Sequence, residues 1–196
     1  LDGVPVYNVD HLLGFFSVFT PEAVKKVTLF KSSFPARFGG RLSSVIDVRT
    51  NDGDMKNYHG VVSVGLLTSK INFEGPIIKN RTSFNISARR SYIDLLAKPF
   101  MPKDEKYSYY FFDVNAKINH KFSDRSRLFL SAYNGKDHFM TKYDDTYYGD
   151  EDKYRDGGKM NWGNTIVSGR WNYIFNNKLF SNTTVAFNNY KFDVST

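Results

Sequence analysis

The chain has no cysteine among its 196 residues, and this absence excludes two classes of protein. Without thiols it can hold neither a disulfide framework nor a thiolate metal site. Its four histidines, His11, His59, His120 and His138, are too scattered in sequence to indicate a metal cluster, although the fold could still bring them together. The sequence therefore predicts no metal site and no cofactor.

Long apolar runs and catalytic motifs are also missing. The longest apolar stretch, residues 12–19, spans about eight residues and is interrupted by Gly14 and Ser17, whereas a membrane helix needs about 20. A membrane protein of this composition could therefore only be a β-barrel. No nucleophile elbow, phosphate-binding loop or pair of catalytic carboxylates occurs, so the sequence predicts no enzyme.

The residues that are abundant favour β-sheet. The chain combines 13 Tyr and 18 Phe with low mean hydropathy, a mixture typical of sheets with one apolar and one polar face. Its net charge of +7 would suit an anionic partner, but the basic residues are interspersed with acidic ones. No nucleic-acid partner is therefore predicted. Because the chain begins at Leu1 without a signal peptide, we expect a fragment or a processed piece.

The first part of the chain predicts a small α+β unit. Its expected elements are a strand over residues 1–8, a short helix over about residues 21–25, strands over residues 27–31 and 44–50, and a turn over residues 51–54. The stretch 34–49 contains Gly39-Gly40 between two arginines. Glycine permits positive φ and close approach of another surface, so this stretch is predicted to be a hinge and a contact surface, with an ordinary tight turn as the alternative.

From residue 58 onward the apolar residues recur with a period of two. In the clearest strand, the even positions from Tyr110 to Phe122 are mainly apolar, while Asp113, Asn115 and Lys117 occupy odd positions. Further strands are expected before and after a turn near residues 66–69, from residue 82, from residue 127 to about residue 137, over residues 161–175 and from residue 179 to about residue 192. The sequence thus predicts a series of antiparallel strands.

The predicted connections alternate in length. They are short at residues 76–81, 123–126 and 176–178, and long at residues 91–106, with a helical turn near residues 92–97, and at residues 139–160. Aromatic residues gather at both strand ends: Tyr107, Tyr109, Tyr110, Phe111 and Phe112 at one, and Phe122, Tyr173, Phe175 and Phe180 at the other. This pattern is typical of an outer-membrane barrel with two aromatic girdles. A soluble β-sandwich, whose strands also alternate, is the alternative.

Several motifs, taken in order, point to a family. They are Leu1-Asp2-Gly3-Val4-Pro5-Val6, Thr20-Pro21-Glu22-Ala23-Val24, the stretch 34–49, Phe73-Glu74-Gly75-Pro76 and Ser87-Ala88-Arg89-Arg90-Ser91-Tyr92. In this combination the whole chain resembles the TonB-dependent outer-membrane receptors of the Bacteroidetes type.

The resemblance implies a mostly β protein in the outer membrane of a Gram-negative bacterium. Residues 1–55 would be the C-terminal part of the plug domain, and residues 56–196 the first seven or so strands of a transmembrane barrel. Such a barrel has about 22 strands, so this piece would be a partial barrel. The implied function is TonB-energised import of a scarce nutrient: a siderophore, vitamin, oligosaccharide or peptide. The alternative is a receptor-like structural or interaction subunit of a surface or secretion assembly without transport activity.

The family also implies partners. The TonB complex would act through a segment outside this chain, lipid would surround the strands, and a surface lipoprotein is a candidate partner because the glycan-importing branch pairs with one. The form of residues 35–41 looks closer to the siderophore, vitamin and general receptor branch.

The resemblance further implies contacts between plug and barrel. The predicted contact residues are Arg37, Gly39, Gly40 and Arg41 in the plug stretch and Glu74 and Arg89 in the strands. Glu74, which lies between apolar neighbours, is predicted to pair with Arg37 or Arg41 in a wet interface. The alternative is that these are ordinary solvated charges in the lumen.

A candidate extracellular ligand loop follows from carboxylates mixed with aromatic residues. Its residues are Tyr143, Asp144, Asp145, Tyr147, Tyr148, Asp150 and Asp152. Such a loop could bind a cation, a sugar ring or a metal chelate, but its spacing does not match the calcium-binding loop. A solvated, mobile loop is therefore favoured over a specific metal site.

Overall fold

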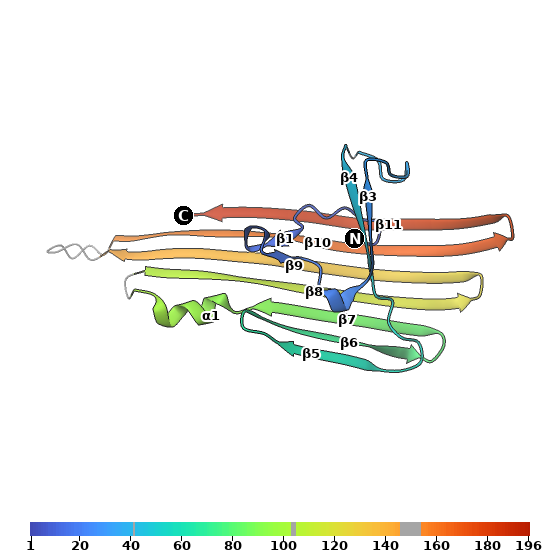
Figure 1. Cartoon of the computed structure of the whole chain (residues 1–196), viewed down its shortest axis with the longest axis horizontal. Helices are drawn as coiled ribbons and strands as arrows, with labels where there is room; N and C mark the ends of the chain where they lie inside the picture. Colours follow the sequence, from blue (N-terminus) through green and yellow to red (C-terminus); the bar gives the residue numbers. More distant parts are fainter. Residues whose placement is uncertain (41, 103–104, 146–153) are drawn as a thin grey trace.

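The computed structural model describes residues 1–40, 42–102, 105–145 and 154–196 (Figure 1). The chain is mostly β, as the alternating pattern predicts, with one small α-helix. A seven-stranded antiparallel sheet holds the later residues, and the earlier residues pack against one of its faces. None of the helices in these ranges is long and apolar enough to cross a membrane.

Each strand of the large sheet pairs with its neighbour in sequence, in the order β11-β10-β9-β8-β7-β6-β5. The strands are β5 (His59–Val64), β6 (Thr68–Ile78), β7 (Thr82–Ser91), β8 (Glu105–Ser123), β9 (Ser126–Asp145), β10 (Tyr154–Asn176) and β11 (Leu179–Ser195). The expected tight turn near residues 66–69 lies between β5 and β6. The sheet is an up-and-down meander, as the strand pattern predicts.

The connections β6–β7, β8–β9 and β10–β11 are short and lie at one end of the sheet (Figure 1). At the other end, α1 (Ile93–Ala97) and the 3₁₀ helix η3 (Lys98–Phe100) link β7 to β8, in agreement with the predicted long connection and its helical turn.

The predicted long loop over residues 139–160 is wrong for most of its length. Residues 139–145 belong to β9 and residues 154–160 to β10, and the two are paired up to Asp145 and Tyr154. The reason is that ladder hydrogen bonds use only backbone groups, so neighbouring strands can extend together through polar sequence.

The residues before β5 form small elements. They are β1 (Asp10–His11), η1 (Leu12–Gly14), β2 (Phe16–Ser17), η2 (Pro21–Ala23), β3 (Val24–Lys31) and β4 (Ser44–Thr50). The pairs β1–β2 and β3–β4 each form a two-stranded antiparallel sheet. We call residues 1–55 the N-terminal segment.

Two predictions for the N-terminal segment are wrong. Residues 1–8 form a bend instead of a strand, because Asp2 and Gly3 have φ of 48° and 90°, and extended backbone requires negative φ. The predicted helix over residues 21–25 is the single turn η2, since Val24 already pairs with Thr50 in the β3–β4 ladder. Tertiary pairing here overrides a weak helix signal.

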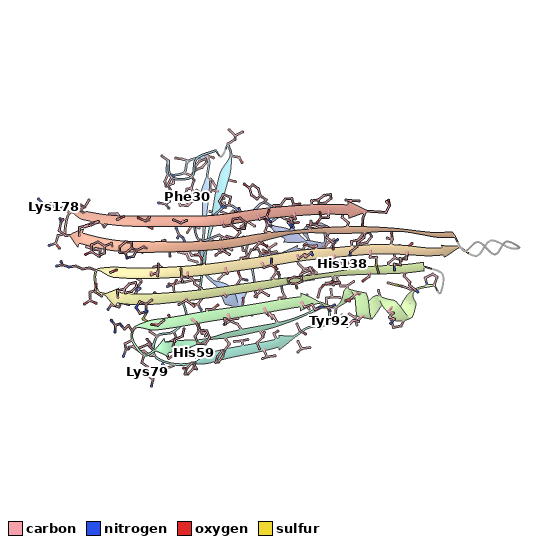
Figure 2. The ribbon with its side chains drawn as sticks, turned by 180° about the vertical axis from the view of Figure 1, so that it is seen from behind. Phe30, His59, Lys79, Tyr92, His138 and Lys178 are labelled. Atoms are coloured by element: carbon pink, nitrogen blue, oxygen red, sulfur yellow. The ribbon has the colours of Figure 1, made fainter. Side chains whose placement is uncertain are left out.

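The two faces of the large sheet differ in polarity and in burial. On β8, Asp113 is fully buried and Lys117 is 4% exposed, whereas Val114 and Ile118 on the opposite face are each 40% exposed. The N-terminal segment covers the polar face. Figure 2 shows the sheet from the uncovered side, with the N-terminal segment behind it. A small apolar cluster of Val4, Val18, Tyr133 and Ile166 joins the segment to the sheet.

Candidate functional site

The interface between the N-terminal segment and the polar face of the sheet holds most of the buried charges of the described residues. Two groups of side chains account for most of them. The His11 cluster consists of His11, Arg89, Tyr109, Asp113, Tyr133 and Asp137, and the Lys117 cluster consists of Asp2, Lys25, Thr50, Asp52 and Lys117. Both join residues of the segment to residues of the strands.

His11 lies between two buried carboxylates. Its Nδ1 is 2.7 Å from Oδ2 of Asp137, and its Nε2 is 2.8 Å from Oδ1 of Asp113. The imidazole stacks on Phe111, with ring centres 4.2 Å apart and planes 7° apart. The β1–β2 pairing and a hydrogen bond of 2.7 Å from the Leu12 backbone N–H to the Tyr109 hydroxyl hold this part of the segment in place.

The other members of the His11 cluster satisfy the remaining carboxylate oxygens. Arg89 donates to Asp113 through Nε at 2.9 Å and also donates to the Ser17 carbonyl at 2.6 Å, which ties β7 to β2. Tyr133 donates to Asp113 at 3.0 Å, and Tyr109 donates to Asp137. With His11 protonated, two cations face two carboxylates, so the buried cluster is neutral.

The charge state of His11 follows from this geometry. Burial lowers the pKa of His11, but the hydrogen bonds to Asp113 and Asp137 outweigh it, and the pKa is raised above the ordinary value. A neutral imidazole donates through one nitrogen only, whereas both nitrogens here face carboxylates. The imidazolium form is therefore the one that fits the site.

The Lys117 cluster is a second buried group of charges. The Lys117 Nζ lies 2.9 Å from Oδ1 of Asp52, 3.3 Å from Oδ1 of Asp2 and 3.1 Å from the Thr50 carbonyl oxygen. These three acceptors match the three N–H groups of an ammonium. Asp52 also pairs with Lys25 at 2.6 Å. Burial raises the pKa of Asp52, but Lys25 and Lys117 outweigh it and hold the pKa below its usual value.

The structure brings only some of the predicted contact residues together. Arg89 lies at the interface, as described. Glu74 accepts hydrogen bonds from Asn51 at 2.7 Å and Asn85 at 3.3 Å, not from Arg37. Arg37 instead lies over the Phe38 ring, 4.6 Å from its centre.

The direction of the β3–β4 hairpin explains this difference. The hairpin leads away from β6 (Figure 1), so its base, at Asn51, reaches Glu74 while its tip does not. Arg37, Gly39 and Gly40 belong to the connection at the tip. Gly40 has φ of 70°, the positive value that the Gly-Gly pair suggests. Arg41 lies outside the described residues.

The candidate ligand loop stays a prediction. The backbone of Tyr143, Asp144 and Asp145 forms the end of β9, and the side chains of these residues are outside the described part. Tyr147, Tyr148, Asp150 and Asp152 lie wholly outside it.

Sequence reasoning assigned two aromatic residues to the wrong environment. Phe111 is fully buried on the polar face, and Tyr109 contacts Asp137 there, so neither belongs to an outward-facing girdle. It also missed the His11 and Lys117 clusters. The sequence did contain one signal for these clusters: Asp113, Lys117 and Asp137 share a strand face with Asn and Ser. Isolated charges on such a face need partners from elsewhere in the chain.

No set of three or more His, Cys, Asp or Glu side chains in the described ranges is arranged to hold a metal ion. Comparison with known proteins adds no relative: no family model, curated protein or solved structure matches the chain.

Proposed function

We propose that this chain belongs to an outer-membrane receptor of a Gram-negative bacterium that imports a scarce nutrient with energy from the TonB complex. In this proposal residues 1–55 are the end of the plug domain, and residues 56–196 are the first strands of the barrel wall. The TonB complex would act on a segment outside this chain.

One observation carries the proposal: the sheet buries its polar face and exposes its apolar face. Large side chains that are 40–72% exposed share the outer face, namely Val114, Ile118, Leu130, Val167, Trp171, Ile86, Val185 and Phe187. A sheet in water does the reverse, since apolar area leaves water on folding. An extended apolar surface of this kind fits lipid outside, and a polar surface under a folded segment fits a plugged lumen.

The dimensions of the apolar surface agree with a bilayer. On β8 its outward positions run from Phe112 to Phe122, about ten steps of ~3.3 Å, which corresponds to about 25 Å when a strand is tilted by about 40°. On β9 the outward positions become polar at the level of Val114 and Phe112, with Asn134 and Lys136. The strands β8 to β11 have 19, 20, 23 and 17 residues, more than the ~9–11 needed to cross a bilayer, so they would extend past it at the α1 end.

The charge clusters fit a plug that must be held and then displaced. Buried ion pairs fix position more than they add stability, and the interface around them is lined with Asn and Ser such as Asn85, Ser87 and Asn115. Polar contacts of this kind can be exchanged for contacts with water when a segment is pulled.

The test is uptake by cells with and without the full-length receptor. We expect deletion to abolish import of one of the four nutrient classes, and a protonophore to abolish the same import in the parent strain, because TonB coupling uses the energised inner membrane. If deletion leaves the import of every siderophore, vitamin, oligosaccharide and peptide tested unchanged, transport is refuted and a receptor-like structural subunit becomes the better explanation.

A further inference from the structure

We infer that the outer face of the sheet carries a binding site for the phosphate-bearing headgroup of a membrane lipid, next to the apolar surface. The inference rests on the proposed function, because it requires this face to meet lipid. The site is a basic belt made of Arg90 of β7, Lys106 of β8, Lys136 and Lys142 of β9, Lys159 of β10 and Lys191 of β11.

The register places the belt on the apolar side of the sheet. Between Glu105 and Lys121 the pairing of β8 with β9 has no bulge, and the pairing of β9 with β10 has none along its length. Side chains two residues apart on one strand share a face, so Lys106 and Lys136 lie on the same side as Val114. All five lysines are exposed.

The belt begins where the apolar surface ends. Val114, Asn134, Thr165 and Asn189 form one row across four strands, and Phe112, Lys136, Gly163 and Lys191 form the next row toward α1. In the first of these rows Asn134 donates to the Thr165 hydroxyl at 2.8 Å. The first charged row is thus about 7 Å beyond Val114, the height at which headgroups begin.

A shallow groove lies in this part of the outer face. Its lining includes Asn134, Lys136, Gly163, Thr165 and Lys191. Lys136 and Lys191 lie on the two strands that flank Gly163, so their Cα atoms are about 10 Å apart. A Cβ at Gly163 would lie 2.2 Å from the Gly135 carbonyl oxygen, so this position cannot carry a side chain and the floor of the groove stays open between the two ammonium groups.

The belt has an excess of positive charge that the described residues do not neutralise. Among the belt residues only Arg90 has a carboxylate partner in the described ranges, Asp94 at 2.9 Å, and Asp193 is the acidic residue that lines the groove. Lys106 and Lys142 are directly opposite each other in the β8–β9 ladder. Like charges in that position repel, so an anion bound between them would relieve a repulsion built into the fold.

A lipid phosphate fits these observations better than a soluble anion. Arg90, Lys136 and Lys191 lie in one row at the edge of the apolar surface, and Lys159, Lys106 and Lys142 lie in rows farther toward the α1 end. The basic side chains thus spread over five strands instead of converging in a closed pocket. Tyr110, an aromatic residue of the kind found at membrane interfaces, packs against Arg90, with its ring centre 4.8 Å from the guanidinium carbon. Acyl chains could cover the apolar surface while the phosphate contacts the lysines.

The test uses the full-length receptor in detergent and a short-chain lipid with a phosphate monoester headgroup, with binding followed by native mass spectrometry. We expect binding to exceed that of a zwitterionic lipid of equal chain length. At about 1 kcal/mol per lysine, the double variant Lys136→Gln/Lys191→Gln should bind about 30-fold more weakly. The matched control is Lys26→Gln/Lys31→Gln, which removes the same charge from exposed positions on β3 and should leave binding unchanged.

Three results would overturn the inference: equal binding of the anionic and zwitterionic lipids, an equal loss in the control variant, or full competition by inorganic phosphate, which would assign the belt to a soluble anion. A receptor that inserts into vesicles but has no headgroup preference refutes only the lipid site. A receptor that does not insert refutes the proposed function itself.

Discussion

Replacing His11 by alanine should release the N-terminal segment from the sheet. The substitution removes a cation that lies 2.7 and 2.8 Å from two fully buried carboxylates. Only Arg89 then faces Asp113 and Asp137, so one buried negative charge is left without compensation. Breaking a buried ion pair in this way typically destabilises by about 3–5 kcal/mol, and losing the stacked contact with Phe111 adds to that loss. We therefore expect the free energy that holds the segment in place to fall by about 3–5 kcal/mol.

The assay is hydrogen exchange in the full-length protein in detergent, read at backbone amides of the N-terminal segment over a series of urea concentrations. Exchange in β8 and β9 serves as the internal reference for the sheet. The control is His59→Ala: His59 is 54% exposed and lies 3.1 Å from Asp54, so its loss should change little, by at most about 1 kcal/mol. If His11→Ala alters exchange no more than His59→Ala does, the His11 cluster does not hold the segment.

The same cluster predicts a dependence on pH. Because the pKa of His11 is raised in the folded protein, its contribution is fully present below the unfolded value of about 6.5 and is lost as pH rises through the folded pKa. Exchange of the segment should therefore accelerate at alkaline pH in the wild type more than in His11→Ala. A wild-type profile as flat as that of the variant would contradict a protonated His11.

Four further outcomes are expected. Lys117→Met leaves Asp52 paired with Lys25 alone and removes the cation beside Asp2, so it should loosen the segment by about 3–5 kcal/mol in the same exchange assay; a change below about 1 kcal/mol would show that the Lys117 cluster is not buried as described. Lowering the pH should weaken the same contact, because the pKa of Asp52 is depressed in the folded protein. The contribution of Asp52 to stability is present above about pH 4 and is lost as pH falls through the folded pKa. An Asp52→Asn variant should not show this loss. Gly53→Ala should destabilise the protein by about 1–3 kcal/mol in urea denaturation. Gly53 has φ of 78°, and an added Cβ would lie 2.2 Å from the Phe84 carbonyl oxygen. The control Gly39→Ala, whose added Cβ would meet no atom within 4 Å, should leave stability unchanged. A double-mutant cycle on Glu22 and Lys70, which lie 2.5 Å apart at partly exposed positions, should give a coupling of no more than about 1 kcal/mol; a larger value would place this pair among the main anchors.

The strands and their two faces were predictable because alternation is a local property of the sequence. Asp113, Val114, Asn115 and Lys117 already show it. The length of the strands was not predictable in the same way: residues 139–145 and 154–160 pair through backbone groups, which side-chain polarity does not reveal.

The interface could not be predicted because its partners are remote in sequence. His11 is separated from Asp113 by 102 residues and from Asp137 by 126. The sequence predicts that Glu74 pairs with Arg37 or Arg41, but Arg37 lies at the tip of the β3–β4 hairpin, away from Glu74, because hairpin direction depends on packing. Asn51, which follows β4, takes the place assigned to the arginine.

Cysteine scanning along β8 tests whether the exposed apolar face meets lipid. The chain has no cysteine, so a single cysteine at each of positions 113–118 provides one labelling site in these strands. A nitroxide or fluorophore attached there can be probed in reconstituted receptor with a lipid-soluble and a water-soluble quencher. We expect labels at Val114, Ala116 and Ile118 to respond to the lipid-soluble quencher alone. Labels at Asn115 and Lys117, beneath the N-terminal segment, should respond to neither or weakly to the water-soluble one. If the labels at Val114 and Ile118 respond to the water-soluble quencher, the outer face is not in a membrane and the sheet is not a barrel wall.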